Sequence, residues 1–167
     1  VADATVTTIN AADNTGGVSI SGLDFTNITS VTGTAANDTF ATTTSIVGTD
    51  TIAGGDGTDT LEIASAITAA TLVTGIENVT VTATALDYEM EVVGATAITF
   101  ATDGTSGGGA DETGAVSDYD GSATITVSDV NIDDLTDDDE FSLDVEAAED
   151  AAEGDADSVT VAIVTTQ

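Results

Sequence analysis

The sequence contains no lysine, arginine or histidine, although 31 of its 167 residues are aspartate or glutamate. The formal net charge is therefore −31, and no basic side chain is present to pair with a carboxylate. Self-repulsion on this scale works against a compact fold. If the chain folds, its carboxylates must be dispersed into water, protonated, or neutralised by cations from solution. A divalent cation held by oxygen atoms is the simplest remedy, and Ca²⁺ is the usual one. Calcium is plentiful outside cells, so we expect an extracellular location.

Other absences narrow the class of protein further. There is no cysteine, which excludes disulfides and thiolate metal sites, so a secreted chain of this kind needs another stabilising device, such as bound metal. Without a basic side chain to meet a phosphate, binding to nucleic acid is excluded. Docking on an anionic membrane is disfavoured for the same reason. No apolar run approaches the ~18 residues of a membrane span, so we expect no insertion into a membrane.

The residues that are present favour a folded, all-β chain. Hydrophobic residues make up 41% of the sequence, which is more than a disordered acidic tail contains. Threonine, valine and isoleucine are abundant, and these residues prefer strands. Aromatic residues make up only 4%, so we expect a thin core of small side chains. Between residues 18 and 83, short β-prone runs alternate with Gly, Asn and Asp at rather even spacing, as in β-solenoids, β-rolls and some sandwiches.

Further strands are expected on both sides of a glycine-rich segment. Residues 102–114 contain five glycines and no large apolar side chain, which is typical of a loop or linker. Residues 146–157 are rich in Ala and Glu but have no apolar stripe, so we interpret them as an acidic loop rather than a helix. Acidic residues are denser after residue 100, with 12 in residues 1–100 and 19 in residues 101–167. The expected strands are residues 1–9, 87–93, 96–100, 122–128, 141–145 and 158–166.

One local motif carries a specific chemical signal. Residues 54–62 (GGDGTDTLE) match the calcium-binding nonapeptide G-G-x-G-x-D-x-U-x at every specified position. The glycines permit a tight turn that exposes backbone carbonyls, Asp59 supplies a carboxylate, and Leu61 points inward to begin the next strand. Calcium requires about 6–8 oxygen ligands, so neighbouring turns must contribute to the site. The predicted ligands in this turn are Gly54, Gly55, Asp56, Gly57 and Asp59. The alternative is a Gly/Asp-rich turn without an ion.

Two nearby segments are related to the nonapeptide. Residues 33–40 (GTAANDTF) are similar to a degenerate copy, with Asn37 and Asp38 in the turn and Phe40 pointing inward. Residues 47–52 (VGTDTI) are a further fragment, with Asp50 in the turn and Ile52 pointing inward. Asn37, Asp38 and Asp50 are therefore additional candidate calcium ligands.

The segments 37–40 (NDTF), 54–63 (GGDGTDTLEI) and 73–85 (VTGIENVTVTATA) resemble the RTX-type segments of bacterial surface-layer proteins and related type I-secreted surface proteins. The resemblance covers residues 33–85, about a third of the chain. It implies an extracellular, calcium-dependent β-structure used in a self-assembling coat or an adhesin. An RTX block has several consecutive nonapeptides, whereas this chain has one clean copy, so the pattern does not predict a long, regular β-roll.

A second group of candidate ligands lies in the acidic C-terminal third. Oxygen-bearing side chains fall at positions 1, 3, 5, 9 and 12 of a twelve-residue loop, as in an EF-hand. A full EF-hand is disfavoured because Asp134 stands where the turn needs glycine and because the flanking segments read as strands. A calcium loop between strands and a solvated acidic loop remain as alternatives. The candidates are Asp129, Asn131, Asp133, Asp137 and Glu140, together with Asp118 and Asp120 of a smaller DxDG turn.

The sequence thus predicts an all-β fold with two regions. Residues 1–102 form short strands with RTX-like calcium turns, as an irregular β-roll or solenoid. Residues 103–121 are a Gly/Asp-rich loop or linker, and residues 122–167 are an acidic, β-sandwich-like region. The alternatives are a single domain covering residues 1–167 and a single β-sandwich throughout.

The sequence leaves three classes of function to consider. The first is a secreted structural protein at the cell surface, stabilised by several Ca²⁺ ions, that associates with itself into a surface layer or filament; a cell-surface polysaccharide is a further candidate partner. The second is a calcium-dependent adhesin or ligand-binding module, for which four Phe, two Tyr and no Trp offer few binding groups. The third is a paired-carboxylate glycosidase, which remains a remote alternative. The usual catalytic groups His, Lys, Arg and Cys are all absent, so we expect no enzyme activity.

Overall fold

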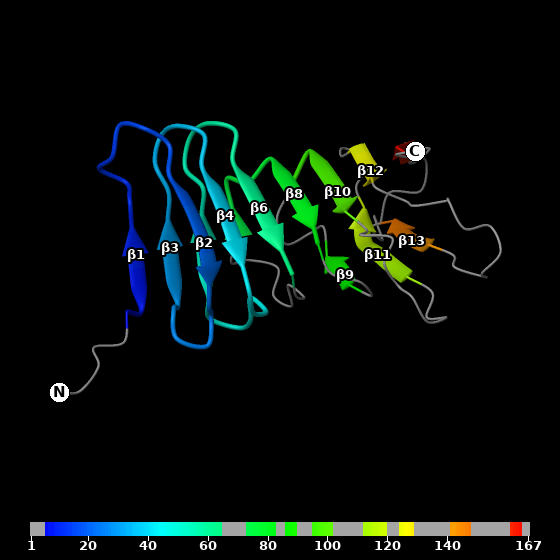
Figure 1. The fold of residues 1–167 in the computed structure, drawn as a ribbon, viewed down its shortest axis with the longest axis horizontal. Helices are drawn as coiled ribbons and strands as arrows, with labels where there is room; N and C mark the ends of the chain where they lie inside the picture. The colour runs from blue at the N-terminus through cyan, green and yellow to red at the C-terminus, as the bar shows by residue number, and fades with distance from the viewer. Residues whose placement is uncertain are drawn as a thin grey trace, which may run out of the picture.

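A computed structural model describes residues 6–64, 73–82, 86–89, 95–101, 112–119, 124–128, 141–147 and 161–164 (Figure 1). The elements within this part of the chain are all β-strands. They are β1 (Thr8–Asn10), β2 (Ser19–Leu23), β3 (Ser30–Thr32), β4 (Thr39–Thr42), β5 (Thr51–Ala53), β6 (Thr60–Ile63), β7 (Val73–Thr74), β8 (Asn78–Val81), β9 (Leu86–Glu89), β10 (Ala97–Ala101), β11 (Glu112–Tyr119), β12 (Thr124–Ser128), β13 (Phe141–Ala147) and β14 (Val161–Val164).

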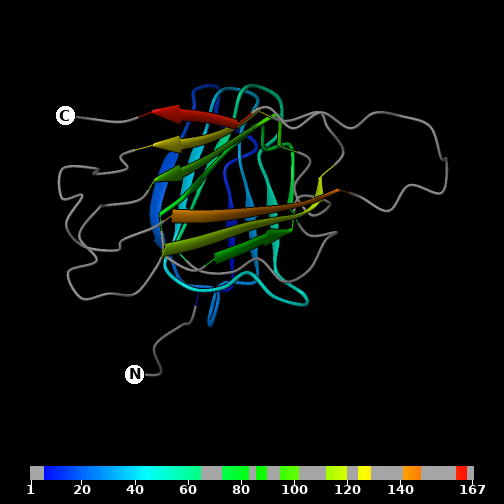
Figure 2. The same cartoon turned by 90° about the vertical axis from the view of Figure 1, so that its right-hand side faces the viewer.

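The strands wind into a parallel β-solenoid. Odd-numbered strands form a four-stranded sheet (β1-β3-β5-β7) and a three-stranded sheet (β13-β11-β9), while even-numbered strands form a seven-stranded sheet from β14 to β2. Every pairing between these strands is parallel. The chain therefore crosses from one sheet to the other after each strand, and the two layers face each other when the molecule is turned (Figure 2).

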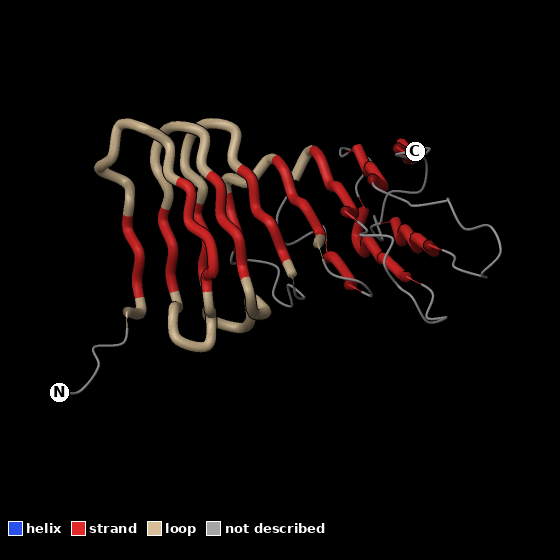
Figure 3. Tube along the Cα trace, in the orientation of Figure 1, coloured by secondary structure: helices blue, strands red, loops and turns tan. Residues whose placement is uncertain are grey.

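The turns at the top of Figures 1 and 3 position the candidate site. They comprise residues 11–18, 33–38, 54–59 and 75–77, and each connects a strand of the four-stranded sheet to a strand of the seven-stranded sheet. We call them the upper turns. Because all strands within a sheet are parallel, successive upper turns stack directly on one another.

The core lies between the two layers. Inward side chains of the seven-stranded sheet are in register from strand to strand, and those of the four-stranded sheet face them. The first column consists of Phe40, Leu61, Val79, Ile98 and Ile125, and the facing column consists of Val31, Ile52 and Val73; all eight are buried. Burying each large apolar side chain stabilises the fold by about 1.5–3 kcal/mol, so this ladder is the main source of stability in the described coils.

The amino-acid pattern explains why these segments are strands. In β4 and β8, buried and half-buried positions alternate, because successive side chains on a strand point to opposite faces. Threonine fills many of the outward positions, where its branched side chain fits a pleated surface. The predicted inward positions Phe40, Ile52 and Leu61 are confirmed, since all three are fully buried.

The structure can be compared with the strands and loops expected from the sequence. The all-β class is confirmed, and strands occur within or overlapping each segment expected to form one. The segment 103–121 is corrected in part: Glu112–Tyr119 is not a loop but β11, because both of its edges are occupied by the neighbouring strands β9 and β13. The rest of that segment, and residues 148–157 of the expected acidic loop, lie outside the described residues.

A separate sandwich-like region is not confirmed. Strand β12 pairs in parallel with β10, and β14 pairs in parallel with β12, so these two strands extend the seven-stranded sheet, while β13 pairs in parallel with β11 in the three-stranded sheet. Sandwiches are built from antiparallel strands, whereas the sequence pattern of short strands is common to sandwiches and solenoids.

Candidate functional site

Two acidic side chains occupy equivalent places in consecutive upper turns. Asp38 directly precedes β4 and Asp59 directly precedes β6, and the pairing of Thr39 with Thr60 places the two aspartates next to each other. Both are buried, with exposed fractions of 2% for Asp38 and 0% for Asp59. The degenerate copy at 33–40 and the clean nonapeptide at 54–62 are thus stacked, 21 residues apart.

A chain of hydrogen bonds runs through this stack from coil to coil. The N–H of Val18 donates to Oδ1 of Asp38 at 2.7 Å, and the N–H of Asp38 donates to Oδ1 of Asp59 at 2.7 Å. The N–H of Asp59 then donates to Oε2 of Glu77 at 2.8 Å. Each carboxylate therefore caps the backbone of the coil before it. We call Asp38, Asp59 and Glu77 the carboxylate column.

Asp38 has all the partners that a buried carboxylate needs. Besides Val18, the N–H of Thr34 donates to its Oδ2 at 2.6 Å, and the hydroxyl of Thr34 donates to its Oδ1 at 3.0 Å. Three donors on two oxygens compensate for the loss of water around a buried charge. The turn at residues 33–38, which we call the first turn, therefore satisfies its buried carboxylate with donors from Thr34 and from the preceding coil; the turn at 54–59 is the second turn.

Asp59 differs at one oxygen. Its Oδ2 is buried, and no donor among the described residues forms a hydrogen bond with it. The position equivalent to Thr34 is Gly55, which has no hydroxyl group and adopts φ +114°, a backbone conformation that favours glycine. Thr34 Oγ1 therefore has no counterpart in the second turn, and the N–H of Gly55 does not reach Oδ2 of Asp59 as the N–H of Thr34 reaches Oδ2 of Asp38. A buried carboxylate oxygen without a partner is destabilising unless a positive species meets it.

Burial and the neighbouring carboxylates both disfavour the charged form of the Asp59 side chain. Burial raises the pKa of its carboxyl above the usual value, and repulsion from Asp38 and Glu77 acts in the same direction. The hydrogen bond from the N–H of Asp38 opposes this rise. The column thus places three like charges in adjacent coils of a chain that has no basic side chain.

Gly54 makes room for the unpartnered oxygen. A Cβ at Gly54 would lie 1.9 Å from the carbonyl oxygen of Gly75 and 2.4 Å from Oδ2 of Asp59. Gly33 has the same relations in the turn before, where a Cβ would lie 2.2 Å from the carbonyl oxygen of Gly54 and 2.3 Å from Oδ2 of Asp38. Backbone carbonyls of one coil and the carboxylate of the coil before it therefore approach the same glycine. This close packing of oxygen atoms is the feature that a hard cation would exploit.

The described residues also limit what kind of cation site this can be. Among them, no group of three or more Asp or Glu side chains converges as a ready-made metal site. A calcium ion at Asp59 would therefore draw most of its ligands from backbone oxygens of the stacked turns. The buried Oδ2 without a donor and the carbonyl oxygen of Gly75, which both lie against Gly54, are oxygens of the kind that such an ion binds.

The other predicted ligands of the upper turns lie at their exposed side. Gly55, Asp56 and Gly57 are exposed. Asn37 is also exposed, and its Oδ1 accepts a hydrogen bond of 3.0 Å from the N–H of Thr58, which holds the two turns together.

Asp50 is separated from this group. It directly precedes β5 at the opposite end of the coil, is buried, and accepts a 3.0 Å hydrogen bond from the N–H of Val47. The structure therefore does not bring Asp50 together with Asp38 and Asp59.

The C-terminal candidates fall into two groups. Asp118 lies in β11 and not in a DxDG turn, because the pairing of β11 with β13 continues to Tyr119 after a register shift. Asp120, Asp129, Asn131, Asp133, Asp137 and Glu140 lie outside the described residues.

Sequence reasoning missed Thr34, Gly75 and Glu77. The signal for Thr34 was its place in a 21-residue repeat, where it aligns with Gly55 of the nonapeptide. Glu77 precedes a strand as Asp38 and Asp59 do, but its turn is shorter and follows after only 18 residues, so a fixed repeat length conceals it.

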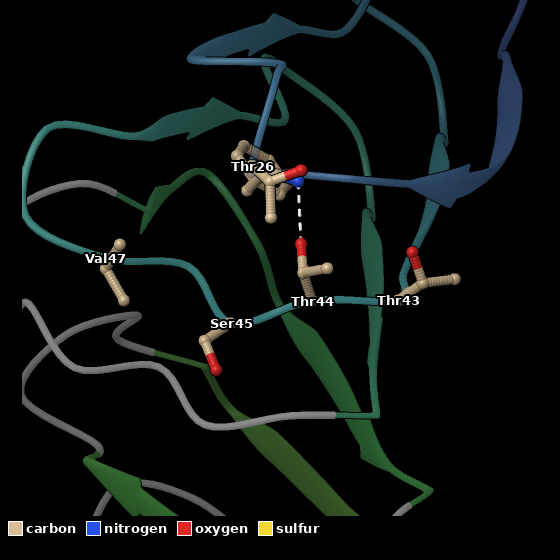
Figure 4. Close-up of a pocket in the computed structure, with 6 residues that line it drawn as sticks. Thr26, Thr43, Thr44, Ser45 and Val47 are labelled. Carbon is tan, nitrogen blue, oxygen red and sulfur yellow. Dashed lines mark hydrogen bonds between the residues drawn. The ribbon is translucent and has the colours of Figure 1, made fainter.

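A pocket on the lower side of the solenoid offers a second place for a ligand. It has a volume of about 440 Å³ and is lined by Phe25, Thr26, Thr43, Thr44, Ser45 and Val47 (Figure 4). The hydroxyl of Thr44 accepts a 2.7 Å hydrogen bond from the N–H of Phe25 within it. Its lining contains no charged side chain, so it supports no chemistry beyond weak polar contact.

Comparison of the chain with protein-family models, curated proteins and solved structures finds no match. Among the described residues there is no helix with the length and apolarity that crossing a bilayer requires.

Proposed function

We propose that this chain is an extracellular structural protein, stabilised by calcium, that associates with itself into a surface layer or filament. It acts as a scaffold at the cell surface and not as an enzyme. A cell-surface polysaccharide is a further candidate partner.

The parallel solenoid supports a structural role. Each coil contacts chiefly its neighbours, so such folds grow as extended, quasi-one-dimensional bodies. Among the described strands, β2 and β14 are the end strands of the seven-stranded sheet, and each pairs on one side alone. End strands offer unpaired backbone groups to another chain, and head-to-tail pairing of this kind generates filaments.

The distribution of charge supports contact between copies. Strands β1 to β8 contain one acidic residue, Glu62, whereas the remaining acids of residues 6–82 lie in the turns. The two sheet faces of these coils are therefore nearly uncharged in a chain of net charge −31. Two strongly acidic molecules approach each other most easily through such faces, because like charges placed opposite one another are repulsive.

The observation on which the calcium proposal rests is the buried Oδ2 of Asp59. It has no hydrogen-bond donor among the described residues, lies between two further carboxylates, and belongs to the one turn that matches the calcium nonapeptide in full. Binding of calcium to the folded state alone would stabilise it by ~2.7 kcal/mol at a hundredfold excess over Kd.

The test compares the metal-free and calcium-loaded protein. We expect EDTA to lower the melting temperature and to dissolve assemblies seen by electron microscopy, and millimolar CaCl₂ to restore both. NaCl at matched ionic strength is the control for general screening of the net charge. If melting and sedimentation do not differ between EDTA and CaCl₂, or if NaCl has the same effect as CaCl₂, the calcium part of the proposal is wrong. Monodisperse particles under every condition would contradict self-assembly.

A further inference from the structure

The two stacked turns at 33–38 and 54–59 are built alike, but the hydrogen-bond donors to their aspartates differ. Both place an aspartate before a strand, both begin with a glycine against a carbonyl of the next coil, and both aspartates are buried. Their four central residues differ, and at the second position the first turn has Thr34 where the second turn has Gly55.

Thr34 supplies what a cation would otherwise supply. Its N–H and its hydroxyl reach both oxygens of Asp38, at 2.6 Å and 3.0 Å. The same hydroxyl lies 3.1 Å from the carbonyl oxygen of Ala36 and accepts a 3.0 Å hydrogen bond from the N–H of Ala36. The N–H of Thr34 thus serves Oδ2 of Asp38, and its hydroxyl adds a second donor to Oδ1 beside the N–H of Val18, so both oxygens of Asp38 have donors.

In the second turn, neither the N–H of Gly55 nor a hydroxyl reaches Oδ2 of Asp59. Gly55 has no side chain, and a Cβ at that position would lie 1.9 Å from the carbonyl oxygen of Thr34 in the preceding coil. A threonine at position 55 is therefore excluded by the stacking itself. Oδ2 of Asp59 remains buried and without a donor among the described residues.

We infer that the second turn takes a divalent, oxygen-seeking cation at Oδ2 of Asp59, whereas Thr34 replaces that cation in the first turn. Asp38 is then a structural residue and not a metal ligand, and Thr34 is the residue that makes its turn independent of metal. This inference rests on the proposed binding of calcium, and it divides the predicted ligands into one turn that uses the ion and one that does not.

The experiment compares Asp59→Asn with Asp38→Asn in the full chain. Protein is stripped with EDTA and titrated with CaCl₂ by isothermal calorimetry, and melting temperatures are measured in EDTA and in CaCl₂. Asparagine keeps the shape of the side chain and one oxygen acceptor but removes the charge. We expect Asp59→Asn to weaken calcium affinity at least tenfold, about the smallest loss that substitution around a metal usually causes, and to reduce the calcium-induced rise in melting temperature.

Asp38→Asn is expected to bind calcium as the unchanged protein does and to lower the melting temperature equally in EDTA and in CaCl₂. Thr34→Val removes the hydroxyl but keeps the N–H that serves Oδ2 of Asp38, and Oδ1 keeps the N–H of Val18. It is therefore expected to leave calcium affinity unchanged and to lower the melting temperature less than Asp38→Asn does. An equal loss of calcium affinity in Asp38→Asn and Asp59→Asn would overturn the inference while leaving calcium binding intact. If the unchanged protein binds no calcium in the titration, the proposed function loses its calcium component and the inference falls with it.

Discussion

The backbone N–H of Asp38 donates a 2.7 Å hydrogen bond to Oδ1 of Asp59, so the side chain of one coil caps the backbone of the coil before it. The same relation joins Val18 to Asp38 and Asp59 to Glu77. These bonds satisfy donors that the turns would otherwise bury, since the residue before each strand lies beyond the regular pairing of the sheet. The carboxylates therefore hold the coils in register as well as carrying charge.

The structural part of this relation predicts the effect of Asp38→Ala. The substitution leaves the buried N–H of Thr34 and the half-buried N–H of Val18 without their acceptor. Each unpaired buried donor costs about 1–3 kcal/mol, so we expect a loss of at least that size in urea denaturation. Asp38→Asn is the matched control because it keeps one acceptor oxygen, and it should lose less. Equal losses in the two variants would contradict the role assigned to the carboxylate oxygens.

The close approach at Gly54 predicts that Gly54→Ala is strongly destabilising. Its Cβ would meet the carbonyl oxygen of Gly75 at 1.9 Å and Oδ2 of Asp59 at 2.4 Å. The coils must separate to relieve this contact, and overpacking of this kind costs about 1–3 kcal/mol. Chemical denaturation measures the change in the free energy of unfolding.

Gly16→Ala is the control for Gly54→Ala. A Cβ at Gly16 would meet no atom within 4 Å, and Gly16 is not among the glycines with positive φ. The substitution should be neutral or stabilise by about 0.4–1 kcal/mol through the unfolded state. Similar destabilisation by both substitutions would show that the stacking at Gly54 is not the cause.

The inward column of the seven-stranded sheet predicts the cost of a core truncation. Leu61 is fully buried between Phe40 and Val79 of the neighbouring strands. Leu61→Ala removes these contacts and leaves a cavity, so we expect a loss of about 2–5 kcal/mol. Glu62→Ala, at the next and exposed position, should change stability by no more than about 0.5 kcal/mol. A smaller effect at position 61 than at position 62 would mean that the strand has the opposite face inward.

The sequence was sufficient to predict the positions of Asp59 and Leu61, because the nonapeptide specifies both the turn residue and the first inward residue of the next strand. It also predicted Phe40 as inward, since residues 33–40 follow the same plan. It was not sufficient to predict parallel pairing: a short strand with alternating burial has the same pattern in a solenoid and in a sandwich.

Three residues of the site could not be predicted from the local sequence, because their roles depend on contacts between coils. Glu77 joins the carboxylate column only because β8 pairs with β6, although its turn is shorter than the two before it. Thr34 belongs to the site because its hydroxyl donates to Asp38, and Gly75 belongs to it because its carbonyl oxygen lies against Gly54. A sequence motif describes one turn at a time, whereas these relations exist only once the turns are stacked.

In the turn at the opposite end of the first coil, the hydroxyl of Thr26 donates a 2.6 Å hydrogen bond to Oδ1 of Asp24. This bond lowers the pKa of the Asp24 carboxyl below its usual value, and the N–H of Thr26 and the side chain of Asn27 contribute in the same direction. Because the folded-state pKa lies below the unfolded one, the stabilisation by Asp24 is present above the unfolded pKa and is lost as the pH falls through the folded pKa.

We therefore expect Thr26→Ala to raise the pKa of Asp24, as measured by NMR titration of its side-chain carboxyl carbon, because the hydroxyl donor is lost and the backbone donor remains. Thr26→Ser keeps the hydroxyl and should leave the titration of Asp24 close to that of the unchanged protein. In acid denaturation, Thr26→Ala should also show a smaller loss of stability across the range between the folded and unfolded pKa values of Asp24. If Asp24 titrates identically in the alanine and serine variants, the hydroxyl bond is not what holds its proton affinity down.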